Sequence, residues 1–205
     1  MKIPSITKAW IYGGIIVGAG IGIARILERG ALVKRGGRLM LVGDSLSVGL
    51  APPLKAVAVE SGVSFVHVGE TGTRIDQWSS NSTVQGIKLN QTLASFAPTL
   101  ILVSLGTNDE YLKKYGTADV LAKQKPYIDA LMVKLKATGA EVAWIGPPTN
   151  AYQSPELRAY LASVVGKSRY FPSEKYTLPR QQDGLHPTVA GYAGWTGLIW
   201  QWVMQ

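Results

Sequence analysis

The sequence contains no cysteine and only two histidines, His67 and His186. The absence of cysteine excludes a disulfide framework, a thiolate zinc site, an iron–sulfur cluster and a cysteine nucleophile. Two histidines are too few for a metal site made of several imidazoles, and the sequence has no H-E-x-x-H motif. We therefore expect no metal and no cofactor, and histidine-based catalysis would have two candidate residues.

Charged residues are also few, at 17% against 46% hydrophobic residues, which is not the composition of a disordered chain. The formal net charge of +8 is unevenly distributed, because residues 1–37 carry a net charge of +5 and residues 38–205 carry only +3. The excess positive charge flanks an apolar stretch, a pattern typical of membrane proteins rather than of proteins that bind duplexes. We expect no nucleic-acid binding.

The apolar stretch, residues 9–24, has no charged side chain. As a helix its 16 residues would span about 24 Å, against about 30 Å for the hydrocarbon core of a bilayer. Lys8 and Arg25 at its ends can snorkel to the membrane surface. The pattern favours a membrane anchor. A cleaved signal peptide that ends near Ala24 and a glycine-rich buried helix are the alternatives.

Glycines recur every four residues within this stretch, at Gly14, Gly18 and Gly22. They would share one helix face, a pattern that lets membrane helices associate closely. We therefore predict self-association through these glycines. Residues 1–37 are interpreted as the anchor or signal segment with a basic linker, and residues 38–205 as one globular domain.

The globular part alternates between strand and helix patterns. Four apolar runs predict buried strands, at residues 38–42, 63–68, 99–105 and 141–145. Five further stretches predict helices, at residues 46–61, 83–96, 117–138, 154–166 and 188–204. This alternation predicts an α/β fold, a three-layer α/β/α sandwich with a central parallel sheet, preceded by an N-terminal hydrophobic helix. The last helix carries three tryptophans and no charge, so we expect it to pack deeply.

Polar motifs follow three of the predicted strands and precede the last helix. Sites in open parallel sheets lie at the carboxyl ends of the strands, so these motifs are expected to meet there. Each motif alone is typical of a turn, and the prediction depends on their joint occurrence. The motifs are Gly43-Asp44-Ser45-Leu46, Thr71-Gly72-Thr73, Gly106-Thr107-Asn108-Asp109 and Asp183-Gly184-Leu185-His186-Pro187.

Three of these side chains have the chemistry of a catalytic triad. Ser45 follows a buried strand and begins a helix, where its hydroxyl can point into a cleft. A serine hydroxyl is a poor nucleophile until a base takes its proton, and His186 can be that base. Asp183 lies three residues before His186, so its carboxylate can reach the imidazole and fix its tautomer.

Three donors are candidates for an oxyanion hole: the Ser45 N–H, the Gly72 N–H and the side-chain amide of Asn108. Gly69 competes with Gly72 for this role, because both follow the second predicted strand closely. Losing one oxyanion donor typically costs roughly 2.7–4 kcal/mol of transition-state stabilisation.

The remaining polar residues of the motifs are expected to support the site. Asp44 is predicted to shape the turn at the nucleophile, and Asp109 to brace its loop. His67 lies within the second predicted strand and is interpreted as a structural histidine with a hydrogen-bond partner.

Taken together, the motifs resemble those of the SGNH/GDSL hydrolases, a family named after the serine, glycine, asparagine and histidine described above. The serine, G-x-N-D and D-x-x-H blocks match fully, whereas the residues around Gly72 match loosely. The resemblance covers residues 38–205. It implies a flavodoxin-like α/β/α fold and metal-independent hydrolysis of esters, thioesters or acetylated sugars.

The sequence says less about the substrate. Four aromatic residues of the expected loops suit the faces of sugars or an acyl groove, and no long apolar lid is visible. We predict a short-acyl, acetyl-type esterase acting on a cell-envelope or extracellular glycan, with its domain outside the cytoplasm. The alternatives are a lysophospholipase or thioesterase for longer acyl chains, and a membrane-tethered glycan-binding surface or virion protein. The aromatic residues are Trp78, Tyr111, Tyr115 and Tyr152.

Overall fold

The structure is a computed structural model that describes residues 31–205. The predicted helix at residues 9–24, with Gly14, Gly18 and Gly22, lies outside the described residues. Within residues 31–205 no helix is both long enough and apolar enough to cross a membrane. The N-terminal hydrophobic helix therefore has no support in the structure, and membrane anchorage and the location of the domain stay predictions.

Five parallel strands form one sheet in the order β2-β1-β3-β4-β5, which is the flavodoxin-like order. The four predicted strands are confirmed, and the short β5 at the sheet edge was not predicted. Two residues are too few to give an alternation pattern, so β5 has no signal in the sequence. The strands are β1 (Arg38–Gly43), β2 (Ser64–Gly69), β3 (Leu100–Ser104), β4 (Glu141–Ile145) and β5 (Tyr170–Phe171).

Seven α-helices are formed by residues 31–205, and five of them correspond to the predicted ones. The two additional helices, α2 and α4, have only five and four residues. The α-helices are α1 (Ser45–Glu60), α2 (Ile75–Ser79), α3 (Val84–Phe96), α4 (Thr107–Glu110), α5 (Val120–Lys136), α6 (Pro155–Val165) and α7 (Val189–Val203). Three 3-10 helices are η1 (Tyr111–Tyr115), η2 (Lys167–Arg169) and η3 (Ser173–Lys175).

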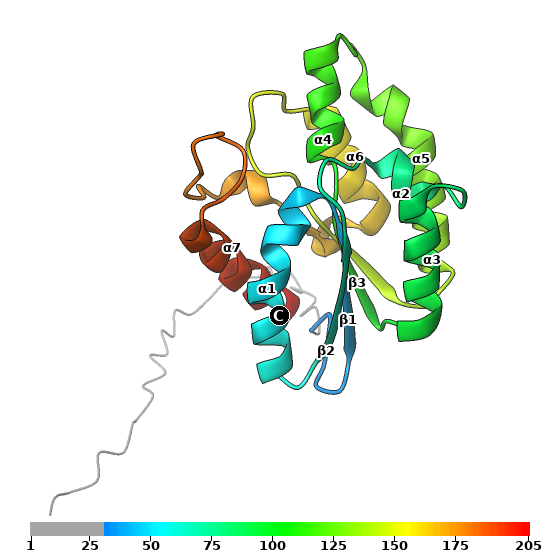
Figure 1. Cartoon of the computed structure of the whole chain (residues 1–205), viewed down its shortest axis with the longest axis vertical. Helices are drawn as coiled ribbons and strands as arrows, with labels where there is room; N and C mark the ends of the chain where they lie inside the picture. The colour runs from blue at the N-terminus through cyan, green and yellow to red at the C-terminus, as the bar shows by residue number, and fades with distance from the viewer. Residues whose placement is uncertain (1–30) are drawn as a thin grey trace, which may run out of the picture.

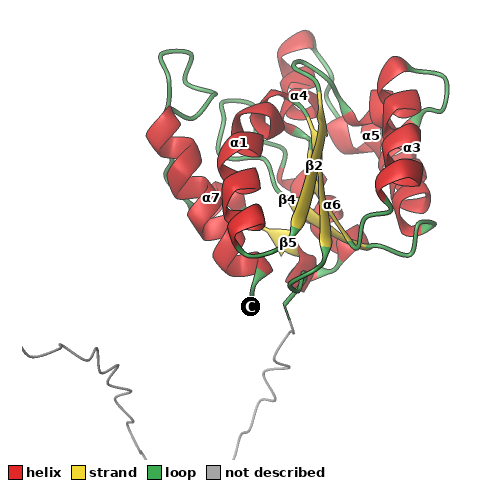
Figure 2. Cartoon of the chain, turned by 60° about the horizontal axis from the view of Figure 1, so that its bottom comes forward, coloured by secondary structure: helices red, strands yellow, loops and turns green. Residues whose placement is uncertain are grey.

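The helices cover both faces of the sheet and make the three predicted layers (Figures 1 and 2). Successive residues of a strand point to opposite faces, so each buried strand contributes to two cores. Met40 and Trp144 pack with α2, α3, α5 and α6, whereas Leu41 and Ile145 pack with α1 and α7. Both faces of the strands are apolar because both faces are covered.

Helix α7 packs deeply, as its composition predicts. Trp195 is fully buried, and its indole N–H donates to Ser173 Oγ at 3.2 Å. Trp200 and Trp202 are partly buried against the same core. The helix fits closely against α1, since a Cβ on Gly49 would lie 2.1 Å from the Tyr192 ring. This packing holds the segment before α7 at one end of the sheet.

Packing of the domain begins before the predicted boundary at residue 38. The Leu32 N–H donates to Val203 O at 2.8 Å, at the end of α7. Val33 is buried in the core between the sheet and α1. Residues 32 and 33 are therefore part of the packed domain.

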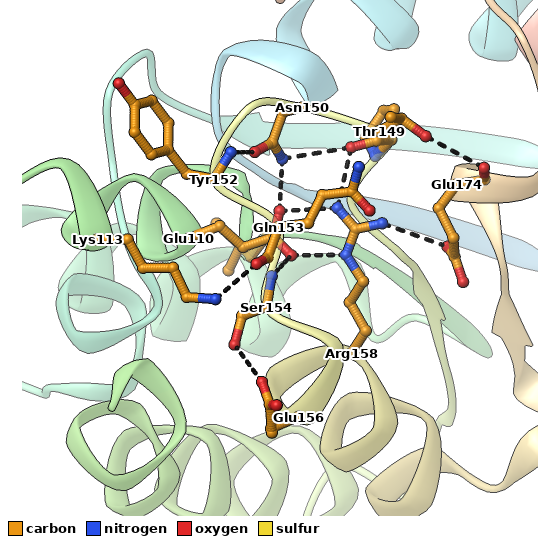
Figure 3. A network of polar contacts seen from close by, with 12 residues as sticks. Glu110, Lys113, Thr149, Asn150, Tyr152, Gln153, Ser154, Glu156, Arg158 and Glu174 are labelled. Carbon is orange, nitrogen blue, oxygen red and sulfur yellow. Dashed lines mark hydrogen bonds and ion pairs between the residues drawn. The ribbon is translucent and has the colours of Figure 1, made fainter. Parts of the chain in front are cut away.

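A buried ion pair joins α4 to α6 at the carboxyl end of the sheet (Figure 3). The Glu110 carboxylate accepts from Arg158 Nε at 2.6 Å and from Arg158 Nη2 at 2.8 Å. It also accepts from the Ser154 N–H at 3.0 Å and from the Asn150 side chain. Glu110 is fully buried and Arg158 is 6% exposed. Each charge therefore needs the other to offset the free energy lost when it is removed from water.

We predict that Arg158→Met lowers the free energy of unfolding by about 3–5 kcal/mol, because it leaves the buried Glu110 carboxylate without its cation. Urea unfolding of the full chain measures the change. Replacing both residues with methionine removes the unpaired charge and should recover part of the loss. A single variant as stable as the wild type would contradict the prediction.

Candidate active site

The turn after β1 places Ser45 at the carboxyl end of the sheet. Gly43 is required there, because a Cβ would lie 2.1 Å from the Ser104 carbonyl oxygen of β3. Asp44 then caps α1, with its Oδ1 accepting from the Leu46 N–H at 3.0 Å. Ser45 is the first residue of α1, so its N–H lies among the helix donors that have no intrahelical partner.

The loop before α7 brings His186 to Ser45. His186 Nε2 lies 2.9 Å from Ser45 Oγ, although the residues are 141 positions apart. His186 Nδ1 lies 2.6 Å from Asp183 Oδ2. The other oxygen of Asp183 accepts from the Leu185 N–H at 2.8 Å and from the His186 N–H at 2.9 Å. The three side chains predicted as a triad thus form one hydrogen-bonded chain.

These contacts indicate which atoms carry protons in the hydrogen-bonded series Ser45–His186–Asp183. The pKa of Asp183 is lowered to about 2, first by its side-chain hydrogen bond with His186 and then by the two backbone donors. The carboxylate is therefore ionised at neutral pH and accepts from Nδ1–H. Nε2 is then the unprotonated nitrogen and accepts the Ser45 hydroxyl proton. This is the arrangement that activates a serine for nucleophilic attack.

Asn108 is held between two of the other motifs. Its Nδ2 donates to Thr73 O at 2.9 Å, which fixes one N–H of the amide. Its contact with Asp44 Oδ2 is long, at 3.4 Å. The second N–H is therefore weakly held and lies beside the nucleophile turn.

Gly72 and Gly69 have different structural roles. Gly69 ends β2, and a Cβ there would lie 2.2 Å from His67 Nε2 and 2.5 Å from Ser47 Oγ. Gly69 is therefore a packing residue. Gly72 lies in the loop after β2 with a φ of +78°, and a Cβ there would meet no atom within 4 Å. Its position next to Thr73, which accepts from Asn108, favours Gly72 as the oxyanion donor.

Asp44 and Asp109 are buried carboxyls beside this group. Burial raises the pKa of Asp44 to about 7 and that of Asp109 to about 8. Asp109 Oδ1 accepts from the Ile75 N–H at 3.3 Å, which ties α4 to α2 and matches the bracing role predicted for it. At pH values below about 6 both carboxyls are mostly protonated, so they place little negative charge next to Asn108.

A second serine–histidine pair, Ser47 and His67, supports the turn between β1 and α1. Ser47 is fully buried, and its hydroxyl donates to Asp44 O at 2.7 Å. His67 Nε2 lies 3.0 Å from the same Ser47 oxygen. Because the single hydroxyl proton is already donated to Asp44, His67 serves as the donor to Ser47. His67 is thus a structural histidine, as the sequence predicts.

Two tyrosines form an aromatic pair beside α4. The rings of Tyr111 and Tyr152 meet edge to face with centroids 4.8 Å apart. Tyr111 lies three residues after Asn108, so it stands one turn along from the oxyanion candidate. Of the other aromatics expected near the site, Trp78 is a correction: it is fully buried in the core. Its ring packs among apolar residues of the core, and its indole N–H donates to Thr73 Oγ1 at 3.0 Å.

Several residues near the site were missed in the sequence. Arg158 stands on the apolar side of α6 between Leu157 and Leu161, and such an arginine signals a buried ion pair. Arg180 and Asn150 gave no signal, because their partners Thr149 and Glu110 lie 31 and 40 positions away in the sequence. Within residues 31–205, no group of three or more His, Asp or Glu is placed to hold a metal ion.

The raised pKa of Asp109 predicts a pH-dependent stability. The folded chain keeps a proton that the unfolded chain releases above the ordinary value of 3.8. The free energy of unfolding therefore falls as the pH rises from about 4 to about 8, and then levels off. Asp109→Asn removes the titration but keeps the acceptor for Ile75. It should gain about 4 kcal/mol relative to the wild type between pH 5 and pH 9, because about three pH units of this titration lie in that range.

Urea unfolding at the two pH values measures this gain. The exposed Asp119, which caps α5 through its side chain, provides the control Asp119→Asn. An equal gain in both variants would attribute the effect to net charge and contradict the role of burial.

Comparison with solved structures identifies the fold. No protein-family model matches the chain, and no curated protein matches it. An acetylxylan esterase from Geobacillus stearothermophilus, solved as a catalytic mutant, matches with a TM-score of 0.62 and 15% identity, over 83% of this chain and 95% of that chain. A psychrotrophic esterase from Pseudoalteromonas sp., inhibited by monoethylphosphonate, matches with a TM-score of 0.62 and 17% identity, over 82% and 96%.

A structure described as TesA matches with a TM-score of 0.60 and 22% identity, over 81% of this chain and 97% of that chain. Further matches are described as an SGNH hydrolase from Slackia heliotrinireducens and a GDSL-like lipase from Bacteroides uniformis. Each matched structure is covered almost completely by the described domain. The chain therefore has the fold of the SGNH/GDSL hydrolases, as its four motifs imply.

Proposed function

We propose that the protein is a serine hydrolase that cleaves carboxylic esters without a metal. The observation that carries the proposal is the hydrogen-bonded chain from Ser45 Oγ through His186 to Asp183, with contacts of 2.9 Å and 2.6 Å. Asn108 lies beside the turn of Ser45, with its Nδ2 3.4 Å from Asp44 Oδ2, and Gly72 precedes Thr73, whose carbonyl oxygen accepts from Asn108. The matched solved structures include esterases, which supports the same reaction class.

The proposed reaction has two steps. Ser45 Oγ attacks the ester carbonyl carbon as its proton moves to His186 Nε2, and the carbonyl electron pair moves onto the oxygen. The tetrahedral intermediate breaks its bond to the alcohol, which takes the proton from Nε2. A water molecule then attacks the acyl group, gives its proton to Nε2, and Ser45 leaves with that proton.

The negative oxygen of the intermediate requires donors. The N–H groups of Ser45 and Gly72 and the second N–H of Asn108 are the proposed oxyanion hole. In the described structure that second N–H makes only the long contact with Asp44, so a substrate oxygen can replace it. The raised pKa values of Asp44 and Asp109 reduce the negative charge that would oppose the developing oxyanion.

We predict that Ser45→Ala abolishes ester hydrolysis and labelling by a fluorophosphonate probe while the fold is retained, because no other hydroxyl of residues 31–205 is paired with His186. Turnover of p-nitrophenyl acetate and covalent labelling of the full chain measure this. Ser95→Ala, an exposed serine of α3, is the matched control and should remain active.

Appreciable turnover by Ser45→Ala would contradict the assignment of the nucleophile. A folded wild-type protein that neither hydrolyses esters nor reacts with the probe would contradict the enzyme proposal. That result would favour the glycan-binding protein considered from the sequence.

For the substrate, we propose a short acyl group, such as acetyl, on a glycan. The rim beside Asn108 carries the Tyr111–Tyr152 pair, whose rings offer apolar faces and polar tips to a sugar. Lys113 adds polar character to the same side. Two of the matched structures are acetylxylan esterases, which supports this class.

A longer acyl chain, as in a lysophospholipase or thioesterase, is the second candidate. Val48 and Val189 are 41% and 89% exposed, and each lies three residues after Ser45 or His186. Exposed valines at both sides of the nucleophile could contact an acyl chain.

A chain-length profile separates the two. We expect the kcat/KM of the full chain to be highest for acetyl or butyryl esters and to fall at least tenfold for octanoyl and palmitoyl esters, because a polar rim gives little burial for each added methylene. Hydrolysis of the four p-nitrophenyl esters, with Ser45→Ala as the blank, measures the profile. A kcat/KM that rises towards palmitoyl would replace the short-acyl proposal with the second candidate.

A further inference from the structure

We propose that Arg180 is a positioning residue that fastens the base-bearing loop, residues 180–187, to the body of the domain. The proposal rests on the proposed function, because it concerns how His186 is kept in register with Ser45. Arg180 is not a catalytic residue in this proposal. It acts through the main chain of the loop.

The loop itself is held mostly by short-range contacts. Its base is closed by the Thr188 N–H donating to Pro179 O at 2.9 Å and the Gln181 N–H donating to His186 O at 2.8 Å. Its tip is open to solvent, with the Asp183 side chain 46% exposed and that of His186 29% exposed. These bonds give the loop its shape, but they do not set its distance from Ser45.

Arg180 and Asp183 both hydrogen-bond to the peptide group between Leu185 and His186, Arg180 at its oxygen and Asp183 at its N–H. The carbonyl oxygen of Leu185 accepts from Arg180 Nη1. The N–H of the same peptide group belongs to His186 and donates to Asp183 Oδ1 at 2.9 Å. Because a peptide group is planar, holding its oxygen and its N–H fixes the direction in which the backbone enters His186.

The second donor group of the Arg180 guanidinium, Nη2, binds outside the loop of His186. Arg180 Nη2 donates at 3.0 Å to the carbonyl oxygen of Thr149, in the loop between β4 and α6. A guanidinium group is suited to this, because its donors diverge in one plane and can serve two carbonyls at once. Arg180 thus connects the loop of His186 to the loop of Thr149.

The loop of Thr149 is itself fastened to the oxyanion side of the site (Figure 3). The next residue, Asn150, donates through Nδ2 to the Glu110 carboxylate, and the buried Arg158 holds that carboxylate. Glu110 belongs to α4, the helix that carries Asn108. A path of hydrogen bonds and short stretches of main chain therefore runs from the base loop to the helix that carries Asn108, and Arg180 is its link to the base loop.

The test is the steady-state kinetics of Arg180→Met, which keeps a long apolar stem and removes both donors. A displacement of the order of 1 Å in a reacting group costs up to about 100-fold in rate. We expect kcat for p-nitrophenyl acetate to fall about 10- to 100-fold with KM changed less than twofold, since substrate binding is not addressed. The rate of fluorophosphonate labelling of Ser45 should fall in parallel.

Two further measurements distinguish positioning from a general loss of structure. Arg180→Lys keeps the charge and the apolar stem, but one ammonium group cannot reproduce the two diverging hydrogen bonds that the planar guanidinium group donates. Arg180→Lys should also lower kcat while KM changes less than twofold. It replaces Arg180→Met as the test if Arg180→Met does not fold. In Arg180→Ala, added methylguanidinium should restore part of kcat. Arg38→Met, which loses a side-chain bond to Ala97 O elsewhere, is the control and should keep wild-type kcat.

Wild-type kcat in Arg180→Lys, or a raised KM with unchanged kcat in either variant, would overturn the proposal. Absence of turnover in the wild-type chain would instead be a failure of the proposed function. Because the wild type and Ser45→Ala are measured in the same experiment, the two failures are distinguishable.

Discussion

Asp44 joins the parts of the site more directly than any other residue between 31 and 205. Its carboxyl group caps α1 and makes a long contact with Asn108, and its carbonyl oxygen accepts from Ser47. The ends of β1 and β3 therefore meet at one residue, whose N–H donates to Ser104 O of β3 at 3.2 Å and whose side chain is almost completely buried. A cap on a solvent-exposed helix would stabilise the turn less, because water would compete for each of these hydrogen bonds. Burial makes the cap rigid, and the raised pKa of Asp44 is the accompanying cost.

The sequence predicted those parts of the molecule whose signal is local. Buried parallel strands are continuous apolar runs, and three polar motifs begin where such runs end, so the sheet and the positions of Ser45 and Asn108 followed. Asp183 and His186 were predictable because three residues separate them. The glycine position needed the structure, since Gly69 and Gly72 differ in their neighbours rather than in their sequence context.

Contacts between distant loops were not predictable in the same way. Glu110 and Arg158 are 48 positions apart, and Arg180 reaches Thr149 across 31 positions. Only the topology of β4, α6 and the loop before α7 brings them together, and charge alone does not reveal such partners. The two-residue β5 and the short helices α2 and α4 were missed because they are too short for a hydrophobic pattern to repeat within them.

The two halves of the site belong to parts of the domain with different local stability. Ser45 stands on a helix packed into the core, whereas residues 181–184 are all exposed and are held by a few hydrogen bonds. Segments with few buried contacts open at a lower free energy than the global fold. In rising denaturant, the base would leave the nucleophile while the sheet is still intact. Loss of the proposed hydrolytic activity and unfolding would then be separate transitions of the same chain.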